Sequence, residues 1–167
     1  MIDLREIQRP LKQRYREEPK QAVIVSTARC TMESDPRVCR LEAGPMQLRV
    51  SAHEGVGGAG TEPCSGDVLV GALAACQQIT LQMVAAAMGI ALESCEVTVR
   101  GDLDLRGTLG LDRDVPVGYR DLSCEIRLSA PGTTPEQKAK LIELGRRFCV
   151  VHDTLAHGAR IEITVDD

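Results

Sequence analysis

Cysteines are the residues of this sequence whose type and spacing can do chemistry. Cys76 lies in the alanine-rich apolar stretch GALAACQQITLQMVAAAMG, and Cys149 lies far downstream in GRRFCVVHDTLAHG. A thiolate is a nucleophile that can be oxidised to a sulfenic acid, which condenses with a second thiol to form a disulfide. Cysteine also fills cores as a small hydrophobe, which is the plain interpretation of Cys76. Arg146 and Arg147 beside Cys149 either lower its pKa or are solvated partners of a helix end.

The cysteine count and the N-terminus indicate the compartment. The chain has 7 cysteines, an odd number, at wide spacing and without a C-x-x-C pair, which argues against the disulfide framework of a secreted protein. The N-terminus is charged from its start, unlike a secretory signal. We therefore expect a cytoplasmic protein whose other thiols are passive. These are Cys30, Cys39, Cys64, Cys95 and Cys124.

Length and composition exclude several classes of protein. The 167 residues are typical of one domain, and only 2% of them are aromatic. A net charge of -4 without a long basic run argues against a nucleic-acid partner. The most apolar stretch, residues 68–92, carries three glutamines and many alanines, so we expect no membrane partner.

The first third of the chain predicts a helix followed by an antiparallel meander. Residues 3–17 are typical of a polar helix, broken near Pro10 and ended near Pro19, and we treat residues 1–20 as an extension of a domain spanning 21–167. The β-branched run Val23–Val25 predicts a first strand. Two further short strands flank a turn at Gly44-Pro45, and a glycine-rich loop follows.

A long central helix must position Cys76. We expect it to begin near Ser65 to Asp67, with Ser65 as its cap and Asp67 at the positive end of its dipole. It should end at Gly89. Apolar residues at three- and four-residue spacing predict its inward stripe: Leu69, Ala72, Leu73, Cys76, Ile79, Met83 and Ala87.

The rest of the chain completes an α+β order with mostly antiparallel pairing. Residues 94–105 and 119–131 predict a hairpin, and a second helix follows with Thr134 as cap, Pro135 in its first turn and Gln137 closing a capping box. HDTLAHG predicts a helical stub, and residues 159–165 predict a final strand.

Two ligand-binding motifs are weak. Gly55 to Gly60 match G-x-G-x-x-G, but Pro63 and Gly66 separate them from the helix, and no βαβ units follow, so a nucleotide site is disfavoured. Cys149, His152 and His157 make a partial zinc set without an evident fourth ligand, so we expect no metal and no other cofactor.

Two long segments resemble the OsmC/Ohr family of organic hydroperoxide peroxidases. The first is GGAGTEPCSGDVLVGALAACQQITLQMVAAAMGIALESCEVTVRGDLD, and the second is RRFCVVHDTLAHGARIEITV. The similarity covers about residues 22–165, with the elements in the family's order. It implies the OsmC-like fold, with a long central helix, a second helix and an intertwined homodimer.

The resemblance also implies roles for the two thiols. Cys76 matches the peroxidatic cysteine, which attacks an organic hydroperoxide, and Cys149 matches the resolving cysteine, which closes the disulfide. A dithiol reductant, of lipoyl type or a small thiol, then restores both thiols by exchange. The site would lie at the dimer interface, where the apolar stripe forms both a seam and a pocket.

The sequence departs from the family's pattern around the thiol. The family's hydroperoxidases stabilise the thiolate with an arginine, for which Arg29 is the first match and Arg37 the rival. Their glutamate ten residues before the first cysteine is Gly66 here, and Asp67 is one residue out of place. These departures keep open a non-enzymatic module that binds a small apolar ligand at the dimer interface.

Overall fold

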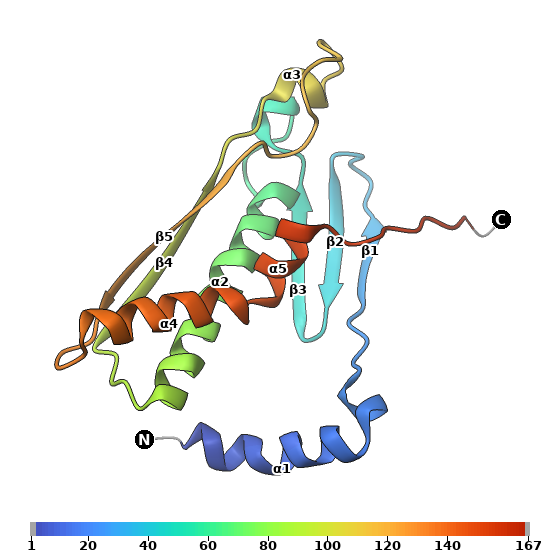
Figure 1. Cartoon of the computed structure of the whole chain (residues 1–167). Coiled ribbons are helices and arrows are strands. Elements are labelled where there is room, and N and C mark those ends of the chain that lie inside the picture. The colour runs from blue at the N-terminus through green and yellow to red at the C-terminus, as the bar shows by residue number, and fades with distance from the viewer. Residues whose placement is uncertain (1–2, 166–167) are drawn as a thin grey trace. The chain divides into compact units, whose positions relative to one another are not determined.

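Two compact units make up the chain, which the computed structural model describes over residues 3–165. The unit that we call the thiol unit is built around residues 72–98 and 125–165, and the meander unit around residues 5–71 and 99–124. Both cysteines that the sequence singles out, Cys76 and Cys149, therefore lie in the thiol unit. The observed elements are mixed α and β, as expected (Figure 1).

The meander unit contains a three-stranded antiparallel sheet. Its strands are β1 (Ala28–Met32), β2 (Val38–Ala43) and β3 (Met46–Ser51), in the order β1-β2-β3. The predicted turn joins β2 to β3, where Gly44 adopts a positive φ of 56° that favours glycine. Side chains alternate across the sheet, so Cys39 and Val50, which are partners in the register, share one face.

Helices precede and follow the strands of this sheet along the chain. Helix α1 (Leu4–Glu17) continues through Pro10, so the predicted break at that residue is wrong. The short helices are η1 (Pro19–Ala22), η2 (Glu54–Val56) and α3 (Leu105–Thr108). Helix α3 contacts η2 within the meander unit.

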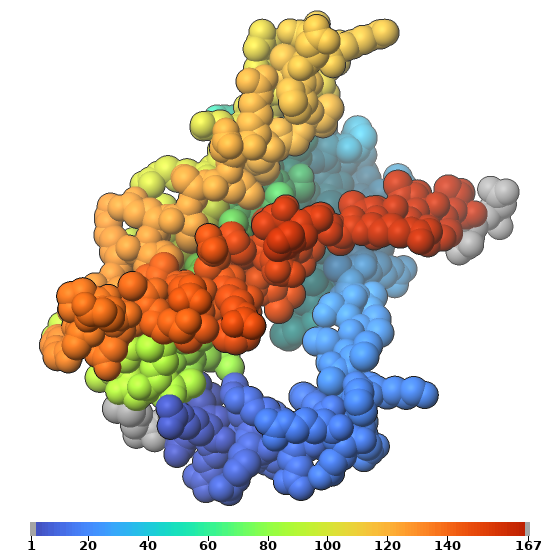
Figure 2. All heavy atoms as spheres, in the orientation of Figure 1, coloured from blue at the N-terminus to red at the C-terminus, as the bar shows by residue number. Residues whose placement is uncertain are grey.

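Two predicted strands are not formed. Residues 23–27 precede β1 without pairing, and Val25 is 89% exposed. Residues 158–165 are likewise extended and unpaired, with Ile163 85% exposed, and Figure 2 shows this segment uncovered at the C-terminal end. A strand requires a neighbour for its backbone hydrogen bonds, and the described part of the chain provides none for these two apolar segments.

Helix α2 (Ser65–Met88) has the predicted extent, and Gly89 ends it with a positive φ of 73°. Its cap is Cys64 rather than Ser65. The Cys64 carbonyl accepts the first helical bond, from Val68 N–H at 3.1 Å. Cys64 Sγ also accepts from Asp67 N–H at 3.4 Å, while the Asp67 carboxylate accepts from Cys64 N–H at 2.8 Å. This reciprocal pair satisfies the first turn as a capping box does.

The buried line of α2 differs from the predicted stripe. Of that stripe only Leu73 is buried, whereas Ile79 is 55% exposed. The buried residues follow a strict four-residue spacing: Leu73, Gln77, Leu81 and Ala85. A count of apolar residues missed this line because it includes a glutamine.

Helix α2 is apolar enough, by length and composition alone, to cross a membrane. Its mean hydropathy reaches 1.6 over an 18-residue window, contrary to the expectation from its glutamines and alanines. The core helix of a globular unit passes the same test. Leu81 and Ala85, with exposures of 0% and 1%, lie in the core of the thiol unit.

The thiol unit packs two helices on α2. Helix α4 (Pro135–Arg147) begins with the predicted capping box of Thr134 and Gln137, and α5 (Val150–His157) follows it. Strands β4 (Ser94–Gly101) and β5 (Leu122–Ser129) form the predicted hairpin. The core consists of Leu81, Ala85, Ile90, Ala130 and Leu141.

Candidate functional site

Cys149 is the N-cap of α5. Its backbone is extended, with φ -79° and ψ 106°, and its carbonyl accepts from Asp153 N–H at 2.9 Å. Its sulfur accepts from His152 N–H at 3.4 Å. The first N–H groups of a helix lack partners within the helix, so they require such an acceptor. The sulfur of Cys149 thus occupies the place that a serine or aspartate oxygen usually takes.

Cys76 meets the same helix end from α2. The N–H groups of Val150 and Val151, the first two residues of α5, act on its sulfur and lower its pKa. The hydroxyl of Thr80, one turn further along α2, and the thiol of Cys149 act on it in the same direction. Cys149 is fully buried at 0% exposure, and Cys76 is half-buried.

The two thiols have opposite pKa shifts. Burial raises the pKa of Cys76, but donors at Val151, Cys149, Thr80 and Val150 outweigh it, so its pKa lies below the ordinary thiol value. Burial raises the pKa of Cys149, and the neighbouring Cys76 sulfur raises it further against the donor at His152. The geometry therefore favours a thiolate on Cys76 beside a neutral thiol on Cys149.

Gly145 sets the distance between α4 and α2. It is buried, and a Cβ at this position would overlap the side chain of Leu81 and crowd Gln77. Glycine thus allows the two helices to approach closely. Because α4 leads directly into Phe148 and Cys149, this close approach helps to hold the Cys149 sulfur against α2.

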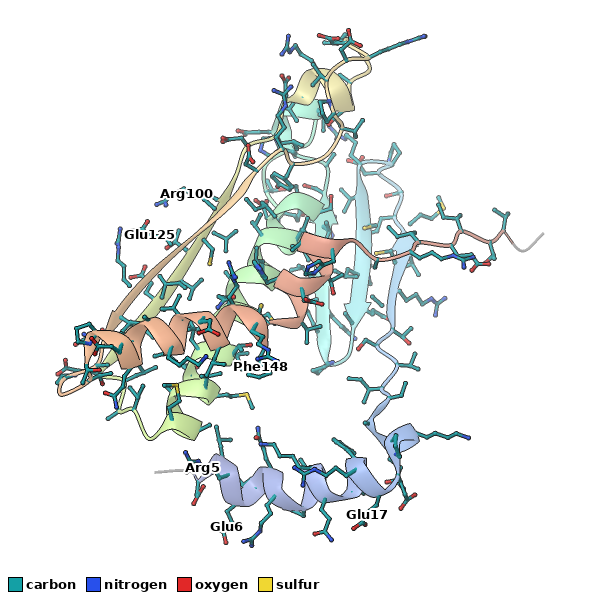
Figure 3. All side chains as sticks on the ribbon, in the orientation of Figure 1. Arg5, Glu6, Glu17, Arg100, Glu125 and Phe148 are labelled. Atoms are coloured by element: carbon teal, nitrogen blue, oxygen red, sulfur yellow. The ribbon has the colours of Figure 1, made fainter. Side chains whose placement is uncertain are left out.

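Apolar side chains surround the start of α5. Phe148, labelled in Figure 3 where α4 meets α5, is 57% exposed, and Val150 is 72% exposed. Both residues flank Cys149 directly in the sequence.

The predicted arginines and acid lie in the meander unit, whereas the sulfur pair lies in the thiol unit. Arg29 is exposed in β1 and lies opposite Glu42 in the register. Arg37 is bidentate to Asp35, at 3.0 and 2.8 Å, and donates to the Gly57 carbonyl at 2.9 Å. This guanidinium lowers the pKa of Asp35 to about 2. Asp67 is used in the cap of α2.

A cavity of about 390 Å³ lies at the start of α2, within the meander unit. His53, Cys64, Asp67 and Tyr119 line it together with apolar side chains. The Tyr119 hydroxyl occupies the space that a side chain on Gly66 would need. Nowhere in residues 3–165 do three metal-binding side chains gather in a set that could hold a metal ion.

The sequence did not reveal the donors to Cys76. Val150 and Val151 act through backbone N–H groups, and Thr80 is one polar residue in an apolar helix. The available signal was the spacing of four between Cys76 and Thr80, which places both on one helix face. A second signal was the C-x-x-H run, in which Cys149 precedes a helix as a cap residue does.

Comparison with known proteins identifies one family. Residues 58–164 match the family described as OsmC-like protein. No match is found among the curated proteins.

Three solved structures have a similar fold. An OsmC-like protein from Mycoplasma pneumoniae is 16% identical with a TM-score of 0.67, over 81% of this chain and 89% of its own. An OsmC-like protein from Vibrio cholerae is 17% identical with a TM-score of 0.66, over 79% and 94%. An organic hydroperoxide resistance protein from Elizabethkingia anophelis is 19% identical with a TM-score of 0.61, over 81% and 91%.

Proposed function

Because this chain belongs to the OsmC-like protein family, we propose that it is a thiol-dependent peroxidase that reduces organic hydroperoxides through Cys76 and Cys149. The observation that carries the proposal is the shared helix end, where the Cys149 thiol donates to a Cys76 sulfur of lowered pKa. A nucleophilic thiol beside a protonated one is the arrangement that peroxide reduction followed by disulfide formation requires.

The first step is attack on the peroxide. The Cys76 thiolate attacks the terminal oxygen of ROOH, the O–O bond breaks, and RO⁻ takes a proton and leaves as the alcohol. Cys76 becomes a sulfenic acid. The N–H groups of Val150 and Val151 hold the thiolate before the reaction without any movement of the chain.

The second step is resolution. The Cys149 sulfur attacks the sulfenic sulfur of Cys76, the S–O bond breaks, and water leaves with the Cys149 proton. The disulfide is then reduced by a dithiol, of lipoyl type or a small thiol, in two exchange steps. We place the protein in the cytoplasm, where such thiols remain reduced.

Uncovered apolar segments support a homodimer. Ile24, Val25, Ile161 and Ile163 are each more than four-fifths exposed, and Ile79 adds apolar surface on α2. Unpaired extended segments of this kind pair readily with another chain. A second copy would give both segments neighbours and would enclose an apolar substrate beside Phe148.

Turnover tests the proposal. The protein is given an alkyl hydroperoxide with dihydrolipoamide or dithiothreitol, and loss of peroxide is followed. We expect turnover in the wild type, none in Cys76→Ser, and slower turnover in Cys149→Ser, where the reductant must attack the Cys76 sulfenic acid itself. Wild-type protein that consumes no peroxide would overturn the proposal.

A non-enzymatic binding module is the second candidate. The observation that favours it is Tyr119, whose hydroxyl fills the side-chain space of Gly66, so no acidic side chain can stand there without displacing it. Binding of an apolar ligand by a protein without turnover would favour this alternative.

A further inference from the structure

Cys30 and Cys39 form a second pair of thiols, in the other unit of the chain from the site described above. Cys30 lies opposite Leu41 and Cys39 lies opposite Met32, in the register of β1 and β2. Because side chains alternate along strands, Cys30 and Cys39 share one face and are diagonal neighbours. Both belong to the meander unit, whereas Cys76 and Cys149 belong to the thiol unit.

The register brings the two thiols within reach of each other. Burial first, then the neighbouring Cys30 thiol and the negative charge of Glu33, raises the pKa of Cys39. Cys30 is exposed, and Cys39 is half-buried. Glu33 is itself paired with Arg40 at 3.6 Å and Arg49 at 3.1 Å. An accessible thiol next to a covered one is the arrangement of an attacking and a resolving cysteine.

We propose that Cys30 and Cys39 are a second thiol–disulfide couple, which exchanges with low-molecular-weight disulfides. The pair requires neither the peroxide nor the Cys76 site, so the proposal is independent of the proposed function.

The exchange runs in two balanced steps. The Cys30 thiolate attacks one sulfur of RSSR, the S–S bond breaks, and RS⁻ leaves, so a mixed disulfide Cys30–S–S–R forms. Cys39 then loses its proton and attacks the Cys30 sulfur, and a second RS⁻ leaves. Two cysteine thiols are oxidised, one RSSR is reduced to two RSH, and the two protons go to the released thiolates.

The position of β1 makes this couple reversible. Diagonal neighbours have Cα atoms about 7–8 Å apart, and a disulfide requires about 7 Å or less. The bond therefore requires β1 to move toward β2. This movement is possible because β1 is a five-residue edge strand whose one partner, within residues 3–165, is β2. A bond formed under such strain is easily reduced again.

Tryptic mapping tests the proposal on the native protein. Cleavage after Arg29, Arg37 and Arg40 separates the cysteines into the peptides CTMESDPR and VCR, so a linked pair of peptides identifies the bond. The protein is equilibrated with oxidised and reduced glutathione at several ratios, free thiols are alkylated, and peptides are measured by mass spectrometry. The same experiment is run on the Cys76→Ser/Cys149→Ser double variant.

We expect the linked peptides to rise with the oxidised fraction of glutathione in both proteins and to fall when reduced glutathione is restored. Cys124→Ser, at an exposed cysteine of β5, should not change their yield. In Cys39→Ser/Arg40→Cys the cysteine moves to the opposite face and lies in the tryptic peptide 38–49, because cleavage after residue 40 is lost. Linkage of this peptide to CTMESDPR should be about tenfold lower.

Two outcomes overturn the proposal. One is a glutathione adduct on Cys30 that persists without linked peptides, because Cys39 then does not resolve it. The other is equal linkage in the Cys39→Ser/Arg40→Cys variant, because the pairing would then not depend on the sheet face.

Discussion

The thiols of Cys76 and Cys149 interact at the start of α5, where the Cys149 sulfur accepts from His152 N–H at 3.4 Å. The pKa of Cys76 is lowered and that of Cys149 is raised, which favours the negative charge on Cys76 and the proton on Cys149. The order of the proposed reaction, attack by Cys76 and resolution by Cys149, follows from that assignment.

Reactivity of Cys76 should depend on pH through this network. The pKa of Cys76 in the folded protein lies below the ordinary thiol value. The thiolate therefore stabilises the fold fully at pH values above the ordinary pKa, and this stabilisation is lost as pH falls through the folded pKa. Cys149→Ala removes a donor and should move the midpoint to higher pH, whereas Cys149→Ser keeps a donor and should move it less. Alkylation rates of Cys76 against pH measure both, and identical midpoints in the two variants would contradict the assignment.

Thr80→Val should slow Cys76 at neutral pH. The change keeps the shape of the side chain and removes the hydroxyl that donates to the Cys76 sulfur. A hydrogen bond to a charged group contributes about 1.5–3 kcal/mol, so we expect roughly a tenfold slower oxidation by alkyl hydroperoxide. Gln82→Ala, at an exposed position of α2, is the control and should react like the wild type.

Gly145→Ala should destabilise the protein because its Cβ would overlap Leu81. Overpacking of a core costs about 1–3 kcal/mol, measured here as the free energy of unfolding in urea. Gly71→Ala is the matched control, since a Cβ there meets nothing within 4 Å on the same kind of helix. Alanine at that position should be neutral or stabilising by up to about 1 kcal/mol. Equal losses in both variants would contradict the close approach of α4 and α2.

A charge in an uncovered apolar segment should weaken the proposed dimer without unfolding a single copy. Ile163→Asp places a carboxylate where the side chain is 85% exposed, so only burial by another chain would penalise it. Leu111→Asp, at a residue 73% exposed in the meander unit, is the control. Light scattering against concentration should show a lower mass for the first variant alone. A wild-type protein that is monomeric at micromolar concentration would remove the basis for the dimer.

Kinetic measurements would distinguish the roles of Arg29 and Arg37 in the oxidation of Cys76. If a cation stabilises the leaving oxygen, Arg29→Ala should slow Cys76 oxidation about tenfold, a barrier of about 1.4 kcal/mol. Arg37→Ala should change the rate less, because this guanidinium is already bonded to Asp35 and Gly57. Unchanged rates in both variants would mean that the α5 N–H groups activate the thiol without an arginine.

Local signals predicted the elements that local interactions stabilise. The capping box of Thr134 and Gln137 and the turn at Gly44 are determined by residues within a few positions, and both are confirmed. The segments at residues 23–25 and 159–165 have strand composition, but a strand also depends on a partner far away in the chain or in another copy. Composition alone carries no information about that partner.

The resemblance proposed the thiols of the candidate site but not the donors around them. Cys76 and Cys149 were found through a resemblance, and the structure places them in contact. The donors at Val150 and Val151 are backbone groups, which every residue but proline has, so no residue type reveals them. The buried side of α2 was mispredicted because Gln77 packs beside Gly145 of α4. A count of apolar residues along one helix contains no information about packing between two helices.

Oxidation of Cys76 and Cys149 should change the dynamics of α5, because both sulfurs lie at its N-terminus. In the reduced protein the Cys149 sulfur accepts from His152 N–H at 3.4 Å. The N–H groups of Val150 and Val151 act on the Cys76 sulfur. A disulfide removes the negative charge of Cys76 and leaves both sulfurs as weak acceptors, so these three amides would lose their protection together. Deuterium would then exchange faster at Val150, Val151 and His152 in the oxidised protein, and an eight-residue helix would fray from its first turn. Oxidation would thereby increase the mobility of the first turn of α5 before any partner binds.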